Sequence, residues 1–152
     1  MIRWLLMPVK PLAEAKSRLA PLLAKEERRD LTRRLLERTL ALAEDSALFA
    51  HLLVISRDPL VWETAQAAGA DALPELGADL NSALTQGACY AWRGGATSLL
   101  ILPADLPLLR SEDLAAICAL SETGDGLVIG AGQDGGTNAL HLRLPPGLPF
   151  RF

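Results

Sequence analysis

The sequence predicts an α/β fold in which a mainly parallel sheet is covered by helices on both faces. Four short runs are continuously apolar, which is typical of strands buried on both sides: Ile2–Met7, Leu52–Ser56, Ser98–Leu102 and Leu127–Ala131. Helical patterns separate them, and this alternation favours right-handed crossovers and a doubly wound sheet. A chain of 152 residues is long enough for one domain with a hydrophobic core and too short for two domains, so we expect a single domain over residues 1–152.

The first half of the chain carries clear helix signals between its strands. Leucines recur at helical spacing among basic residues from Glu26 to Leu48, which predicts a long helix. A shorter helix should follow the second strand, because Asp58 is suited to its N-cap, Pro59 to its first position and Gly69 to its end.

The second half should add a short strand, two further helices and a last strand. We expect Asn81 to cap a helix that runs to Trp92, and Ser111 to cap one that runs to about Ser121. The final run, Ala139–Leu144, alternates better than the others, so it could be an antiparallel or an edge strand.

In a doubly wound sheet, ligands bind beyond the carboxyl ends of the strands, near a point where the strand order reverses. Three loops of this chain follow predicted strands there: residues 8–18, 103–109 and 130–138. We therefore look for chemistry in these loops.

Composition excludes several classes of protein. The formal net charge of −3 argues against general nucleic-acid binding, which usually needs a basic surface, although a local basic pocket stays open. No segment approaches the ~18 apolar residues that span a bilayer, and the apolar start lacks a signal-peptide cleavage pattern. We expect a cytoplasmic protein with no nucleic-acid and no membrane partner.

Neither the cysteines nor the histidines indicate a site. Cys89 and Cys118 are too few and too far apart for a disulfide framework or a zinc site, and small buried residues explain them better. His51 and His141 have no partner that suggests a triad or a metal site, so we interpret both as structural.

The first loop carries three cations, Lys10, Lys16 and Arg18, within nine residues of one another after the first strand. A triphosphate needs several cations to offset its charge, and Arg can hold phosphate oxygens in a bidentate manner. The loop lacks the GxxxxGK[ST] spacing, so it is not a P-loop. A solvated basic turn is the alternative.

The second loop places Asp105 between two prolines, just past an apolar run that we expect to be the central strand. A carboxylate there is suited to bind Mg²⁺ beside phosphates, because Mg²⁺ takes one or two carboxylates and completes its shell with water and phosphate oxygens. An aspartate that merely caps a turn is the alternative.

The third loop contains a literal GxGxxG at Gly130, Gly132 and Gly135. We reject the dinucleotide-binding fingerprint, because that motif opens a helix after the first strand, whereas this one leads from a late strand into another strand. The glycines would let the backbone approach a ligand, with Thr137 and Asn138 offering hydrogen bonds. An ordinary glycine-rich turn is the alternative.

Taken together, these loops resemble one family. The stretch PVKPLAEAKSRL over residues 8–19 is similar to the opening of the 2-phospho-L-lactate guanylyltransferases, also called CofC, a family that includes phosphoenolpyruvate guanylyltransferases. Leu80-Asn81 before a helix, PADLP over 103–107 and GGTNAL over 135–140 resemble its later motifs in the same order. The resemblance covers essentially the whole chain, and four motifs in order are specific.

The resemblance implies a three-layer α/β/α, Rossmann-like nucleotidyltransferase fold. It implies transfer of GMP from GTP to a small phosphorylated three-carbon acid, with release of pyrophosphate. Depending on the member, the acid is 2-phospho-L-lactate, phosphoenolpyruvate or 3-phospho-D-glycerate, and the product is a precursor of coenzyme F(420). GTP and the acid are the expected partners, and a homodimer stays open.

The same resemblance assigns roles by position. The catalytic residues that hold the GTP phosphates would be Lys10, Lys16 and Arg18, with Asn81 near the nucleotide. Asp105 would be catalytic as the ligand of Mg²⁺. The phosphorylated acid would contact Thr137 and Asn138.

One departure accompanies the resemblance. The family continues beyond the Phe-x-Phe element, here residues 150–152, into a Gly-x-Gly-Ser-Phe-x-x-His segment and a helical region with another metal-binding Asp. We therefore expect this sequence to lack the C-terminal part of the family. Two alternatives stay open: a related nucleotidyltransferase with a sugar-phosphate acceptor, and a non-catalytic nucleotide-binding paralogue.

Overall fold

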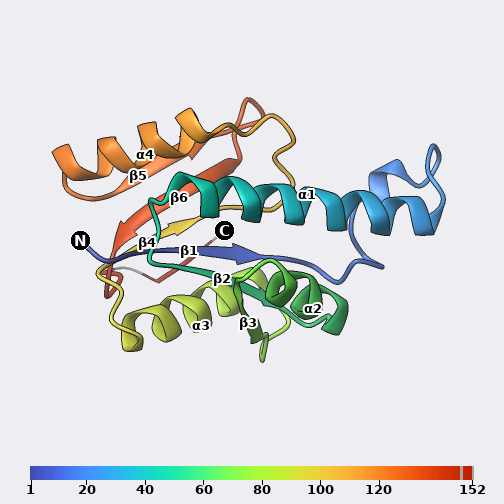
Figure 1. Ribbon diagram of the computed structural model, residues 1–152, viewed down its shortest axis with the longest axis horizontal. Helices are drawn as coiled ribbons and strands as arrows, with labels where there is room; N and C mark the ends of the chain where they lie inside the picture. Colours follow the sequence, from blue (N-terminus) through green and yellow to red (C-terminus); the bar gives the residue numbers. More distant parts are fainter. Residues whose placement is uncertain (148, 152) are drawn as a thin grey trace.

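The computed structural model describes residues 1–147 and 149–151, so Phe152 of the Phe-x-Phe element lies outside the described residues. It confirms the α/β fold class, with a six-stranded sheet in the order β3-β2-β1-β4-β6-β5 (Figure 1). The strands are β1 (Arg3–Pro8), β2 (His51–Ser56), β3 (Asp71–Pro74), β4 (Ser98–Ile101), β5 (Val128–Ala131) and β6 (Thr137–Arg143). The helices are α1 (Lys25–Ser46), α2 (Pro59–Ala67), α3 (Leu80–Arg93) and α4 (Ser111–Thr123), with a 3₁₀ turn at Ser17–Leu19.

The sheet separates two hydrophobic cores, as the continuously apolar strands predict. Because side chains alternate along a strand, Leu5 and Met7 of β1 pack under α1, α2 and α4, whereas Trp4 and Leu6 pack against α3. Figure 1 shows α1 and α4 on one side of the sheet and α3 on the other. The result is a layered α/β/α arrangement with both faces of the central strands buried.

Strands β1 to β4 pair in parallel, whereas β6 runs antiparallel to β4 and β5 runs antiparallel to β6. β1 pairs with β2 on one side and β4 on the other, and β2 pairs with β3. The carboxyl ends of all four strands therefore meet at one edge of the sheet, and the loops that follow them gather there.

The prediction for the fifth strand is wrong in one respect. The apolar run at 127–131 suggested a parallel strand covered on both faces, but β5 is an antiparallel strand at the sheet margin, and Ile129 is 58% exposed. The turn that leads from β5 to β6 is too short for a parallel crossover, so the two strands form a hairpin. The final run is indeed antiparallel, but as β6 it lies between β4 and β5 and not at an edge.

One of the three predicted helix caps is confirmed and two are wrong. Asp58 caps α2, and its Oδ1 accepts a 2.9 Å hydrogen bond from the Leu60 amide. Asn81 does not cap α3, because Asp79, two residues earlier, accepts a 2.9 Å hydrogen bond from the Ser82 amide. The hydroxyl and amide of Ser82 also lower the pKa of Asp79. The sequence offered two capping side chains, and the aspartate is the one used.

The cap of α4 is displaced by one residue. Ser111 is the first residue of the helix, and Arg110 occupies the N-cap position. The Arg110 amide donates a 2.8 Å hydrogen bond to Oδ2 of Asp113, so a carboxylate in the first turn satisfies the helix start in place of the serine hydroxyl.

No helix in the described part of the chain is long and apolar enough to cross a bilayer.

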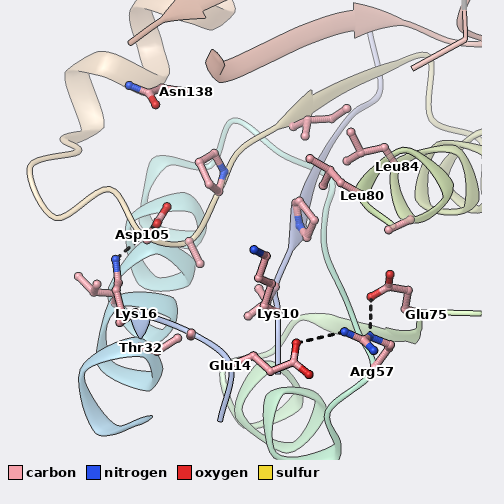
Figure 2. A pocket seen from close by; sticks show the side chains of 18 of the residues that line it. Lys10, Glu14, Lys16, Thr32, Arg57, Glu75, Leu80, Leu84, Asp105 and Asn138 are labelled. Atoms are coloured by element: carbon pink, nitrogen blue, oxygen red, sulfur yellow. Dashed lines mark hydrogen bonds and ion pairs between the residues drawn. The ribbon is translucent and has the colours of Figure 1, made fainter. Parts of the chain in front are cut away.

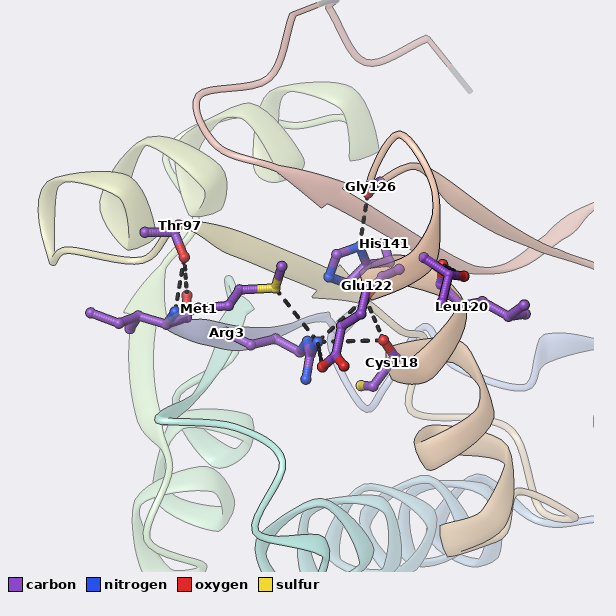
Figure 3. Close-up of polar contacts among 11 residues, drawn as sticks. Met1, Arg3, Thr97, Cys118, Leu120, Glu122, Gly126 and His141 are labelled. Atoms are coloured by element: carbon purple, nitrogen blue, oxygen red, sulfur yellow. Dashed lines mark hydrogen bonds and ion pairs between the residues drawn. The ribbon is translucent and has the colours of Figure 1, made fainter.

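A buried polar group holds the other end of the sheet together (Figure 3). The Arg3 guanidinium, on β1, donates to the Ser121 hydroxyl and lies 3.3 Å from the Glu122 carboxylate, both on α4. His141, fully buried on β6, places Nδ1 2.9 Å from the Gly126 carbonyl oxygen, so the neutral ring donates its Nδ1–H there. Burial lowers the pKa of His141. The prediction that this histidine is structural therefore agrees with its surroundings.

Helix α3 approaches β1 very closely at Gly87. A β-carbon on Gly87 would lie 2.6 Å from two methyl carbons of Leu6, which is fully buried. The missing side chain lets α3 lie against the central strand, and this contact sets the height of the α3 N-terminus at the carboxyl edge of the sheet.

We expect Gly87→Ala to lower the free energy of unfolding by roughly 1–3 kcal/mol, because the overpacking outweighs the ~1 kcal/mol that alanine gains in helix propensity. Urea titration measures the difference. Gly124→Ala is the matched control, since the nearest atom to its β-carbon would be 3.9 Å away and its φ of −123° suits any residue. A Gly87→Ala protein as stable as the wild type would contradict the close approach.

Acid should destabilise this fold partly through His141. The pKa of His141 is lower in the folded chain than its ordinary value of about 6.5. Its contribution to the free energy of unfolding is therefore complete above that pH. The contribution is lost as the pH falls below about 6.5, because the unfolded chain then binds a proton that the folded chain does not. His141→Gln should reduce the slope of unfolding free energy against pH by up to about 1.4 kcal/mol per pH unit below that point. Urea titrations at a series of pH values test this, and an unchanged slope would refute it.

Candidate active site

A large cleft opens at the carboxyl edge of the parallel strands, with a volume of about 1050 Å³. The three loops selected from the sequence all contribute to its wall: the loop after β1, the loop after β4 and the start of β6. The first turns of α3 and the residue after β3 complete it. The edge predicted from strand order is therefore where the chain is hollowed.

The two predicted phosphate and metal loops meet in this cleft through a direct contact. Nζ of Lys16 lies 3.4 Å from Oδ2 of Asp105, although the residues are 89 positions apart in the chain (Figure 2). The Lys16 side chain is 21% exposed and that of Asp105 is 58% exposed. Lys10 and Arg18 line the same cleft, so all three predicted cations face one cavity.

Lys16 also has an unusual backbone. Its φ of 56° and ψ of 33° lie in the left-handed region, at the start of the 3₁₀ turn at Ser17–Leu19. A residue with a β-carbon pays roughly 1–2 kcal/mol for that conformation. Strain of this kind persists where surrounding contacts fix the backbone, and it is concentrated at functional sites. In this chain the strained residue is the one whose side chain contacts Asp105.

The glycine motif forms a tight turn that leads from strand β5 into strand β6, as the prediction of a strand on each side of it requires. The Gly132 amide donates to the Gly136 carbonyl over 2.7 Å, and Asp134 accepts a 3.0 Å hydrogen bond from the Gly136 amide. Gly135 has a φ of 82°, which explains a glycine at this position. No helix follows, so the rejection of a dinucleotide fingerprint is confirmed.

Beyond that turn, Thr137 and Asn138 begin β6 and both line the cleft. Figure 2 shows Asp105 between Asn138 and Lys16. Asn138, one of the two residues predicted for the second substrate, thus lies on the far side of the predicted metal ligand from Lys16.

Asn81 is the one predicted site residue that the structure leaves outside the cleft wall. It lies in the first turn of α3, and its carbonyl oxygen accepts a 2.8 Å hydrogen bond from the Thr85 hydroxyl. Its neighbours Leu80, Ala83 and Leu84 line the cavity instead. A contact of Asn81 with a nucleotide stays a prediction.

Sequence reasoning missed a charged group on the β2 and β3 side of the cleft. A guanidinium nitrogen (NH2) of Arg57 lies 3.3 Å from Glu14 Oε2, and its Nε lies 3.9 Å from Glu75 Oε2 (Figure 2). Burial raises the pKa of Glu75, and Arg57 opposes that shift. Arg57 and Glu75 each follow directly after a parallel strand, so the rule that selected the three loops also applies to these two residues.

Asp105 has the chemistry of a magnesium ligand that works together with phosphates. No group of three His, Cys, Asp or Glu side chains in the described residues could hold a metal by itself. Mg²⁺ at phosphoryl-transfer sites is usually bound by one or two carboxylates together with substrate phosphates, and not by an all-protein cage. A half-exposed carboxylate facing a cavity lined by four basic side chains fits that pattern.

The chain is similar to one family of known proteins over almost its whole length. The family described as "Guanylyl transferase CofC like" matches residues 3–152. The chain belongs to this family. It is 43% identical over 147 residues to a phosphoenolpyruvate guanylyltransferase of Rubrobacter xylanophilus, covering 96% of this chain and 71% of the relative. It is 38% identical to one of Chloroflexus aggregans, covering 96% of this chain and 74% of the relative.

A 2-phospho-L-lactate guanylyltransferase of Methanocaldococcus infernus is 34% identical over 147 residues, which cover 97% of this chain and 64% of the relative. The chain thus spans about two thirds to three quarters of these three relatives. The resemblance seen in the sequence is confirmed at the level of the family.

Solved structures show the same fold at low sequence identity. A 4-diphosphocytidyl-2C-methyl-D-erythritol synthase superposes with a TM-score of 0.65 at 14% identity, covering 93% of this chain and 74% of that one. A cytidylyltransferase from Leptospira borgpetersenii gives a TM-score of 0.62 at 16% identity, covering 95% and 61%. These likenesses confirm the Rossmann-like nucleotidyltransferase fold and carry no information about substrate.

Proposed function

We propose that this chain transfers GMP from GTP to a small phosphorylated acid, releasing pyrophosphate. Its family contains guanylyltransferases named for phosphoenolpyruvate and for 2-phospho-L-lactate. The observation that carries the proposal is the convergence of Lys10, Lys16 and Asp105 on one cleft, with Lys16 and Asp105 3.4 Å apart. The acceptor is 2-phospho-L-lactate, phosphoenolpyruvate or 3-phospho-D-glycerate, and the product is a precursor of coenzyme F(420).

The reaction asks the protein mainly for alignment of two polyanions. A phosphate oxygen of the acid attacks the α-phosphorus of GTP, the bond from that phosphorus to the bridging oxygen breaks, and pyrophosphate leaves with the bond's electron pair. No covalent intermediate on the protein is required. The rate enhancement comes from positioning and from charges that face the developing negative charge.

The cations of the first loop would supply most of that charge. Lys10, Lys16 and Arg18 come from one segment, so they can surround a triphosphate from one side. Arg18 can hold two phosphate oxygens at once, whereas the lysines act as point charges. Thr137 and Asn138 would orient the acid from the opposite wall through hydroxyl and amide hydrogen bonds.

Asp105 would hold Mg²⁺ when the nucleotide is present. Bound there, the ion would neutralise phosphate charge and polarise the reacting phosphoryl group. Without nucleotide, the ion pair with the Lys16 ammonium group keeps the Asp105 carboxylate at the cleft. Carboxylate and ammonium thus stay close enough to serve the same phosphate group.

We expect Asp105→Asn to reduce turnover by at least about 100-fold, because an amide is a poor magnesium ligand and electrostatic stabilisation of this kind is worth several kcal/mol. Release of pyrophosphate in the presence of GTP, Mg²⁺ and each acid in turn measures this.

The unfolding temperature should change little, since the lost ion pair is half-exposed. Asp45→Asn is the control, because Asp45 is exposed on α1 and does not line the cleft. Near-normal turnover of Asp105→Asn would exclude the metal assignment.

Removing the ammonium group of Lys16 should impair both binding and reaction of the nucleotide. For Lys16→Met we expect kcat/KM for GTP to fall by roughly 10- to 1000-fold, from the loss of a charge-assisted contact in a partly enclosed site.

Steady-state kinetics against GTP at saturating acid measures the loss. Lys25→Met, an exposed cation of α1 outside the cleft, should keep wild-type values. Equal losses in the two variants would point to a general charge effect and against a phosphate contact.

A further inference from the structure

The charged group that the sequence did not reveal lies at the opposite end of the cleft from the metal loop. Figure 2 shows Arg57 and Glu75 on one side of Lys10, with Lys16 and Asp105 on the other. Glu75 follows β3, which is two strands from β1 and three from β4. At about 4.8 Å per strand, the ends of β1 and β4 are roughly 10 and 14 Å from the end of β3.

These distances divide the cleft into two regions. Phosphates held by the loops after β1 and β4 place the rest of the nucleotide along the sheet edge, toward β2 and β3 or toward β6. The β6 side is taken by Thr137 and Asn138, which the proposed function assigns to the acid. The nucleobase is then directed to the β3 side, where Glu75, Asp79 and Leu80 line the cavity.

Glu75 is an acceptor with unused capacity. Its side chain is only 12% exposed, yet within residues 1–147 and 149–151 no group donates a hydrogen bond to its carboxylate. Its charged partner, Nε of Arg57, lies at 3.9 Å, which is beyond hydrogen-bond distance. Neither carboxylate oxygen is among the fully buried polar atoms that lack a partner, so the carboxylate reaches the cleft, where donors of a ligand can replace water as its hydrogen-bond partners.

We propose that Glu75 recognises guanine by accepting hydrogen bonds from N1–H and the 2-amino group of the base. This inference rests on the proposed function and deepens it by naming the residue that selects GTP.

Guanine is the common base whose Watson–Crick edge offers two adjacent donors, and a carboxylate offers two matching acceptors. Adenine and cytosine each present one donor beside a ring nitrogen lone pair, which would face the carboxylate and repel it. Uracil presents one donor between two carbonyl oxygens. Arg57 supports the recognition by favouring the ionised, acceptor-only form of Glu75.

The test exchanges the base and the side chain together. Glu75→Gln keeps the size of the side chain but replaces one acceptor by a donor. Xanthosine triphosphate replaces the 2-amino group of guanine by a carbonyl oxygen, which can accept from that amide. We expect the ratio of kcat/KM for GTP over xanthosine triphosphate to fall by at least about 100-fold in Glu75→Gln, since each contact to a charged group is worth roughly 10- to 100-fold.

Because this ratio is measured within one preparation, it does not depend on how much of the variant is folded. Glu14→Gln is the matched control: Glu14 also faces Arg57 and lines the cleft, but its side chain is 57% exposed, and its base preference should stay that of the wild type. With wild-type protein, inosine triphosphate, which lacks the 2-amino group, should react at least about 10-fold less efficiently than GTP.

An unchanged GTP-to-xanthosine triphosphate ratio in Glu75→Gln would overturn the assignment of Glu75, and so would a shift of equal size in Glu14→Gln. The proposed function is tested separately by the wild-type protein alone. If the wild type releases pyrophosphate from GTP with a phosphorylated acid and the ratio does not move, the activity stands and only the base-reading role fails. If it turns over no nucleotide, the proposed function fails.

Discussion

Strand β1 pairs in parallel with β2 over Trp4–Pro8 and with β4 over Arg3–Leu6, so one buried segment sets the register of the whole central sheet. This pairing brings the residues after three strands to the same edge, although Lys10, Arg57 and Asp105 are far apart in the chain. Parallel strands need long crossovers, and α1 and α3 supply them while covering opposite faces. The cleft is thus a consequence of strand direction before any side chain is considered.

The backbone fixes the depth of that cleft as well as its place. At Gly87 the absence of a side chain lets α3 rest on Leu6 of β1, and the first turns of the same helix form one wall of the cavity. The opposite wall depends on a strained residue, Lys16, whose left-handed conformation accompanies the ion pair to Asp105. A close helix contact and a strained loop therefore face each other across the site, and both depend on the rigidity of β1 between them.

The sequence predicts most of this architecture because buried parallel strands are continuously apolar and the helices between them are amphipathic. The same apolarity misled at residues 127–131, where the run is no more polar than a central strand. Its exposure on one face follows from the hairpin with β6, a non-local pairing that composition does not encode. The caps at Asn81 and Ser111 failed for a local reason, since nearby carboxylates, Asp79 and Asp113, bond the amides at the starts of these two helices.

Candidate site residues were found where a motif or a charge cluster drew attention, and missed where a single charge followed a strand. Arg57 and Glu75 have no neighbours of like type in the sequence, and their relation depends on β2 and β3 being adjacent. The contact of Arg57 with Glu14 additionally requires the loop after β1 to fold back across the sheet edge. Pairings of this kind are visible only once strand order is known.

Basic and acidic side chains are distributed unevenly along the cleft. Its wall in the described residues holds four basic and four acidic side chains: Lys10, Lys16, Arg18 and Arg57 against Glu14, Glu75, Asp79 and Asp105. The two kinds are not mixed evenly, because three of the basic residues belong to the loop after β1, whereas Glu75 and Asp79 lie on the β3 side.

A nucleotide also has two different ends, with negatively charged phosphates at one end and hydrogen-bond donors on the base at the other. Reversing it would bring phosphates against Glu75 and Asp79, and like charges in a partly enclosed site repel strongly. With the function proposed above, this uneven charge would favour one orientation of the nucleotide, with its phosphates near the loop after β1 and Asp105 and its base on the β3 side.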